Sequence, residues 1–126
     1  MKYDEFIESV RQRTGLPRPA AATLTHAALR VLGERLSGGE AEDLKAQLPK
    51  ELQDELAVPK EKPALSWGAA EFTRRLAHVA DMDEPAAQIG AAAVIATLRD
   101  AVTPGEFHDV LSQLGREYAA LMRTAP

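Results

Sequence analysis

The sequence aligns with itself when it is shifted by 66 residues, and this internal repeat restricts the possible folds more than any other feature. Residues 6–56 then lie opposite residues 72–122 without a gap, and twelve of the 51 pairs are identical. Three of the identical pairs are alanines in an alanine-rich chain and carry little weight. A repeat of this kind indicates one structural unit that is present twice, with the two copies packed on each other. We therefore predict a single domain over 1–126, made of a first copy at 3–57, a linker at 58–65 and a second copy at 66–123.

Each copy is predicted to hold three helices. Phe6 and Phe72 begin the apolar face of the first helix, where apolar residues recur at helical spacing. Pro19 and Pro85 fall in the first turn of the second helix, where a missing backbone N–H costs nothing. No segment alternates apolar and polar residues over the length of a strand. The chain is therefore predicted to be all-α, a compact bundle of six or seven helices with pseudo-twofold symmetry.

The start of the third helix carries the same signal in both copies. Ser37 is followed three residues later by Glu40, and Thr103 is followed three residues later by Glu106. This is the spacing of a capping box, in which the hydroxyl and the carboxylate each bind a free backbone N–H group. We therefore assign a capping role to both glutamates.

The third helix also carries a repeated glutamine–leucine pair, Gln47-Leu48 in the first copy and Gln113-Leu114 in the second. The two leucines continue the apolar face of the helix. Each glutamine lies beside a core leucine, so we expect it to bind a neighbouring backbone rather than a ligand. Pro49 is expected to kink or break the helix in the first copy.

The composition excludes several kinds of chemistry. The net charge of −4 disfavours binding to nucleic acid and to anionic membranes. The absence of cysteine excludes disulfides, thiolate nucleophiles and thiolate metal sites. No apolar segment has the length of a membrane span or the form of a signal peptide. A cytoplasmic protein without membrane contact is expected, and the abundance of alanine and arginine suggests a bacterial source.

Catalytic and metal-binding motifs are missing. The three histidines, His26, His78 and His108, do not form a ligand signature such as His-Glu-x-x-His. No nucleophile elbow, phosphate-binding loop or dinucleotide fingerprint is present. We therefore expect no enzyme activity, no cofactor and no metal ion.

The second helices of the two copies differ in polarity. In the second copy, residues 85–96 are apolar on all sides apart from Gln88. Such a helix is buried on every side, so it lies either at the centre of the monomer or against a second chain. The second of these alternatives is the reason to expect a homodimer.

Positions that break the symmetry of the repeat are the candidates for a partner surface. They comprise three arginines near the first turn and a polar stripe on the second helix: Arg11, Arg13, Arg18, Thr23, His26 and Arg30. Their counterparts in the second copy are apolar or acidic.

The stretch that follows Ser37 resembles a known family. Together with the preceding amphipathic helix and the two-copy layout, it is similar to the bacterial family called domain of unknown function 2267, and the likeness covers nearly the whole chain. The stretch reads Gly39-Glu40-Ala41-Glu42-Asp43-Leu44-Lys45-Ala46-Gln47-Leu48-Pro49. The second copy departs from it with Gly115 in place of the proline. The resemblance implies a helical prokaryotic protein and carries over no activity and no site residue.

Two functions remain open. The first is a non-catalytic interaction or scaffold module, a homodimer that presents a helical surface to another protein. The alternative is a regulatory domain that binds a small molecule between the two copies, where helices leave clefts. Trp67, the single tryptophan, is assigned to packing or to a helix start rather than to a ligand.

Overall fold

The computed structural model describes residues 1–123, and these residues form helices and connecting loops without strands. The all-α prediction is therefore confirmed for this part of the chain. The helices are α1 (Tyr3–Thr14), α2 (Arg18–Arg35), α3 (Gly38–Ala46), α4 (Lys50–Gln53), the 3-10 helix η1 (Asp54–Leu56), α5 (Ala69–Ala80), α6 (Glu84–Ala101), α7 (Pro104–Leu114) and α8 (Arg116–Met122).

The helix starts recur at a spacing of 66 residues. Helices α1 and α5 both have 12 residues, α2 and α6 both have 18, and α3, α4, α7 and α8 begin at matching positions. We call α1 to η1 the first half and α5 to α8 the second half. The correspondence supports the tandem duplication, which stays a proposal.

The third helix of each half is divided in two, so the described residues form eight α-helices where six or seven were predicted. Pro49 ends the helix in the first half, as expected, and α4 begins directly after it. Gly115 has a φ of 102° and separates α7 from α8 in the same way. A left-handed φ of this kind favours glycine, which has no Cβ to clash.

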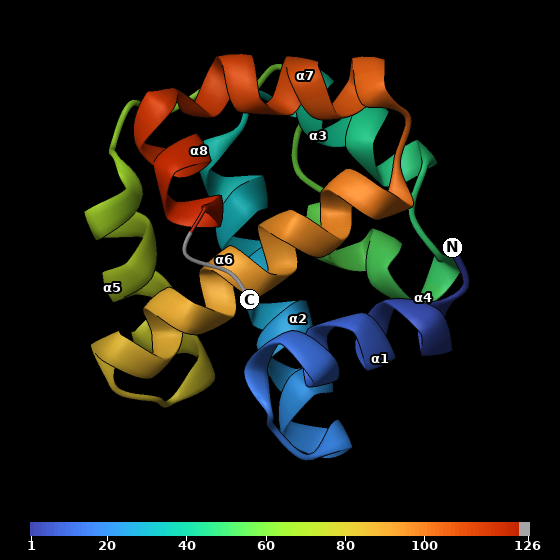
Figure 1. Ribbon diagram of the computed structural model, residues 1–126. Coiled ribbons are helices and arrows are strands. Elements are labelled where there is room, and N and C mark those ends of the chain that lie inside the picture. Colours follow the sequence, from blue (N-terminus) through green and yellow to red (C-terminus); the bar gives the residue numbers. More distant parts are fainter. Residues whose placement is uncertain (124–126) are drawn as a thin grey trace.

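Helix α6 crosses the centre of the molecule (Figure 1). It packs against α1, α2, α5 and α8, and residues 90–98 are all buried. Its two ends are open: Ile89 in the first turns is 51% exposed, and Arg99 and Asp100 in the last turn are exposed. The alternative with this helix at the centre of the monomer therefore holds. A second chain is not needed to cover it, and the homodimer loses the reason for which it was predicted.

The core joins both halves. Phe6, Phe72, Leu48 and Leu114 are at most 5% exposed, as their repeat positions predicted. Pro19 and Pro85 stand in the first turns of α2 and α6. Within residues 1–123, no helix is long and apolar enough to cross a bilayer.

The linker between the halves is hydrogen-bonded to the end of α2 and to the start of α3. The Gly38 N–H donates to the carbonyl oxygen of Lys62 at 2.8 Å, and the Leu65 N–H donates to that of Arg35 at 2.9 Å. The fit is close, because a side chain at Gly38 would collide with the backbone carbonyl of Pro59. The linker therefore packs along the end of α2 and the start of α3.

Candidate functional site

Three polar residues of the first half, Tyr3, His26 and Glu55, form a cluster at the predicted stripe, and we call them the polar trio. The ring of His26 on α2 is bonded at both nitrogens: Nε2 is 3.0 Å from the Tyr3 hydroxyl and Nδ1 is 2.8 Å from Glu55 Oε2. A carboxylate only accepts, so in the neutral ring Nδ1 donates to Glu55 and Nε2 accepts from Tyr3. Arg30 also reaches this carboxylate, with Nε 3.4 Å from Glu55 Oε1. Three separate elements, α1, α2 and η1, therefore meet in one polar cluster.

The predicted stripe lines a hollow. Thr23, His26 and Arg30 follow one another at intervals of three and four residues, which places them on the same face of α2. With Tyr3 and with Val79 of α5 they line a hollow of about 360 Å³. The hollow opens to solvent, because Arg30 and Val79 are exposed. The stripe therefore lies where the first half meets the second.

Two further hollows continue this one along the same seam. One of about 370 Å³ shares Thr23 and is lined mainly by apolar residues that include Leu16 and Met82. The other, of about 380 Å³, shares Val79 and is lined by charged side chains that include Arg74. Because the three hollows share lining residues, they form one surface, which we call the α2–α5 groove.

The three arginines of the predicted surface lie outside this groove. Each is bonded to a carboxylate of the same chain. The pairs are Arg11 with Glu8 at 2.7 Å, Arg13 with Asp100 at 3.0 Å and Arg18 with Asp4 at 2.6 Å. Exposed pairs of this kind add little to stability, but they leave no concentrated positive charge. The structure therefore brings Thr23, His26 and Arg30 together and places Arg11, Arg13 and Arg18 elsewhere.

The two halves cap each other's helices. The Ser37 N–H at the start of α3 donates to Gln113 Oε1 at 2.6 Å, and the Thr103 N–H at the start of α7 donates to Gln47 Oε1 at 2.8 Å. The expectation that these glutamines bind neighbouring backbone is therefore met, with the backbone of the opposite half. Their side-chain N–H groups also lie 3.1 Å and 3.4 Å from the Ser37 and Thr103 hydroxyls.

These glutamines correct the predicted capping boxes. The hydroxyls of Ser37 and Thr103 accept from the backbone N–H groups of Glu40 and Glu106, both at 3.2 Å. The second bond of each box is absent, because the N–H that each glutamate would accept is already held by a glutamine. The glutamates therefore have no capping role.

Freed from capping, the two glutamates face each other between α3 and α7. Glu106 is only 8% exposed, and its burial together with the nearby carboxylates, first Glu40 and then Asp43 and Asp109, raises its pKa to about 8. Desolvation and like charges both disfavour the ionised form. Two acids at corresponding positions of the two halves thus lie against each other, with Glu106 buried and Glu40 half-buried.

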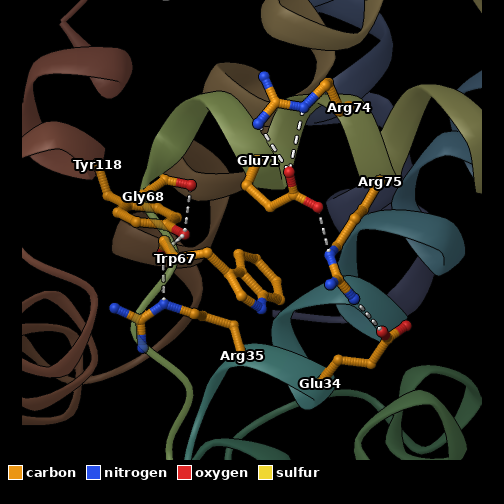
Figure 2. A network of polar contacts seen from close by, with 8 residues as sticks. All are labelled: Glu34, Arg35, Trp67, Gly68, Glu71, Arg74, Arg75 and Tyr118. Atoms are coloured by element: carbon orange, nitrogen blue, oxygen red, sulfur yellow. Dashed lines mark hydrogen bonds and ion pairs between the residues drawn. The ribbon is translucent and has the colours of Figure 1, made fainter.

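A separate network around Arg35 joins the end of α2 to the residues before α5 and to the end of α7, and Figure 2 shows its contact with Trp67. The arginine side chain is 4% exposed; its Nε donates to the carbonyl oxygen of Trp67 at 2.8 Å, and its Nη2 donates to those of Gln113 and Leu114 at 3.1 and 3.0 Å. The last two carbonyls end α7, where the helix dipole favours a cation. The Tyr118 hydroxyl donates to the same Trp67 oxygen at 2.9 Å.

Trp67 itself packs between charged groups. The Arg75 guanidinium lies 4.6 Å from the centre of its ring, a cation–π distance. Arg75 is held in place by Glu71 at 2.9 Å and Glu34 at 3.2 Å (Figure 2). Trp67 lines none of the hollows of the groove. Its assignment to packing agrees with these contacts.

Sequence reasoning did not find Tyr3 and Glu55. They stand 23 and 29 residues from His26, and no local pattern connects them. Comparison of the two halves could have found them, because the positions of Tyr3, His26 and Glu55 are all apolar in the second half. Their counterparts at a spacing of 66 residues are Ala69, Ala92 and Leu121.

Comparison with known proteins places the chain in a family. The chain belongs to the DUF2267 family of uncharacterized conserved proteins, whose model matches residues 3–121. This confirms the resemblance found in the sequence. No curated protein matches the sequence.

Proposed function

We propose that this protein is a non-catalytic interaction module that docks a short segment of a partner protein in the α2–α5 groove. The observation that carries the proposal is the continuity of the three hollows, which share Thr23 and Val79. The lining residues on α2 run from Pro19 to Glu34. At 1.5 Å per residue this is about 22 Å of helix, room for roughly four turns of a docked helix.

The shape of the groove favours a peptide over a small molecule. Small-molecule sites enclose most of their ligand's surface. Each hollow here has a volume of about 360 to 380 Å³ and is open to solvent. A row of such hollows suits successive side chains of an amphipathic helix, which lays its apolar face into a groove.

The lining predicts the chemistry of the partner segment. The Leu16–Met82 end of the groove is mostly apolar and suits an apolar anchor. At the centre, Arg30 is 61% exposed at its side chain and bonds Glu55 only at 3.4 Å. Its guanidinium is therefore available for a carboxylate of the partner. We expect an amphipathic segment with an apolar residue toward Met82 and an acidic residue beside Arg30.

The proposal also covers the oligomeric state, the localisation and the source of the protein. The proposed partner is a different chain, because residues 90–98 of the apolar helix that suggested a homodimer are buried within the monomer. A cytoplasmic protein of bacterial origin is part of the same proposal. Native mass spectrometry separates a monomer bound to another polypeptide from a homodimer.

Photo-crosslinking tests the proposal. A photoreactive phenylalanine analogue replaces the exposed Thr23 in the groove or, as a control, the exposed Glu42 on α3. Crosslinking in the native host followed by peptide mapping identifies the segment attached, and a synthetic peptide of that segment is then titrated into the unmodified protein. We expect attachment through Thr23 alone and saturable binding of the peptide.

Two charge reversals sharpen the result. Arg30→Glu is expected to weaken peptide binding by more than tenfold, about 1.4 kcal/mol. Arg18→Glu, which alters an exposed arginine outside the groove, is expected to leave binding unchanged. Equal crosslinking at both sites, a synthetic peptide that does not bind, or a small-molecule adduct at Thr23 would each overturn the proposal.

A further inference from the structure

Three carboxylates converge at the contact between α3 and α7. Glu40 and Asp43 come from α3 and Glu106 from α7, and one oxygen from each lies within 4.8 Å of the other two. Glu40 and Glu106 are equivalent positions of the two halves. The cluster therefore lies where the two halves meet, away from the residues that line the α2–α5 groove.

A second observation concerns the partners of these oxygens. More than nine-tenths of the Glu106 side chain is buried, yet its Oε2 has no hydrogen-bond partner within the described residues. The Oε2 of Glu40 is likewise buried without a partner there. Buried polar groups are nearly always satisfied, and an ionised carboxylate in the interior is costly unless it is paired. The two oxygens therefore call for a proton or a metal cation between them.

We propose that Glu40, Asp43 and Glu106 bind a hard divalent cation between α3 and α7. Carboxylate oxygens are the ligands that Ca²⁺ and Mg²⁺ prefer, and the cluster contains no nitrogen or sulfur donor. Ca²⁺ binds oxygens at about 2.3 to 2.6 Å, so two ligands on opposite sides of one ion are about 5 Å apart. The separation of the three oxygens is within that reach.

The position of the site determines how far solvent reaches the ion and which helices the ion joins. Asp43 is exposed and Glu106 is buried, so one side of the ion faces solvent and water completes its coordination. An ion here joins the third helices of both halves, next to the reciprocal Gln47 and Gln113 caps. The site thus holds the two halves together, and it does not depend on the proposed function of the groove.

Isothermal titration of the chelator-treated full chain with CaCl₂ and MgCl₂, at constant ionic strength, tests the proposal. We expect one ion per chain. Glu106→Gln keeps the size of the side chain and removes one ligand charge, so it should lower the affinity by more than tenfold, about 1.4 kcal/mol. Glu42→Gln changes an exposed acid of α3 outside the cluster and should leave the affinity unchanged.

Paramagnetic Mn²⁺ locates the ion without a variant. Amide NMR signals should broaden at the first turns of α3 and α7. Broadening spread over other acidic surfaces would overturn the proposal. The absence of binding up to about 10 mM Ca²⁺ or Mg²⁺, beyond the range of weak protein sites, would overturn it as well and would leave a shared proton between Glu40 and Glu106.

Discussion

The two halves of this protein share helices and differ in what those helices present to solvent. Phe6 and Phe72 are both fully buried at matching positions of α1 and α5. The polar trio of the first half, by contrast, has only apolar counterparts in the second. Because the second half folds into the same helices without the trio, the trio is not required by the helical unit. The difference separates residues that form the scaffold from residues available for binding.

The positions where the halves meet behave in the opposite way. Gln47 and Gln113 are identical, and each caps a helix of the other half. Glu40 and Glu106 are identical as well and face each other. A residue at such a contact meets its own counterpart, so one side-chain type must suit both directions. At these two contacts, identity between the halves marks their interface.

The largest effect is expected from Arg35, which stands where the second half has Ala101. Arg35→Ala leaves the buried carbonyl oxygen of Leu114 without its side-chain donor, and it leaves the carbonyl oxygen of Trp67 with the Tyr118 hydroxyl alone. We expect a loss of about 2 to 4 kcal/mol of unfolding free energy, because an unpaired buried carbonyl costs about 1 to 3 kcal/mol and the packing of the arginine side chain is lost as well. Chemical denaturation measures it. A loss below about 1 kcal/mol would show that other contacts hold the end of α7 in place without Arg35.

The next largest effect on stability is expected at Gly38, with the neighbouring Gly39 as its control. Gly38→Ala should destabilise by about 2 kcal/mol, since its new methyl group meets the backbone carbonyls of Pro59 and Lys60, and overpacking costs about 1 to 3 kcal/mol. Gly39→Ala has open space and should be neutral or stabilising by up to about 1 kcal/mol. Thermal unfolding of both variants compares them, and equal midpoints would contradict the close packing of the linker.

The reciprocal caps predict a smaller and unequal pair of effects. Gln113→Ala should cost about 1 to 2 kcal/mol and Gln47→Ala less than about 1 kcal/mol, as for lost helix caps. The bond from Ser37 to Gln113 is shorter and part-buried, whereas that from Thr103 to Gln47 is exposed. Urea denaturation of both single variants measures the difference. A larger loss for Gln47→Ala would reverse this ranking of the two caps.

The last effect concerns pH. The pKa of Glu106 is raised to about 8 from an ordinary value of 4.5, so the folded chain holds a proton that the unfolded chain releases. Stability then falls as pH rises from about 5 through 8, in excess chelator. Glu106→Gln should flatten this dependence. Unfolding midpoints across the pH range measure it, and an unchanged slope in the variant would assign the proton to another group.

The helical fold followed from the sequence because periodicity and proline positions act locally. The 66-residue repeat predicted the burial of Leu48 and Leu114, and Pro49 marked the break before α4. The predicted number of helices, six or seven, was too low, because Gly115 also divides the third helix of the second half. Its left-handed backbone is a local feature that the apolar pattern does not record.

The site was predicted only in part because its partners are distant in the chain. Thr23, His26 and Arg30 share one helix face and could be found from their spacing. Tyr3 and Glu55 come from other elements, and the ion pairs of Arg13 and Arg18 join different helices. The capping boxes failed for the same reason: a glutamine from the opposite half competes for the backbone N–H.

Replacing the polar trio by apolar side chains tests most directly whether it serves binding rather than folding. The variant combines Tyr3→Phe, His26→Ala and Glu55→Leu, the last two being the residues of the second half. Removing the partners of a polar cluster together is close to neutral, and Arg30, which also bonds Glu55, is exposed and remains solvated. Urea denaturation should therefore give an unfolding free energy within about 1 kcal/mol of the wild type, or above it. A loss of more than about 3 kcal/mol, the size of a broken structural network, would contradict the account.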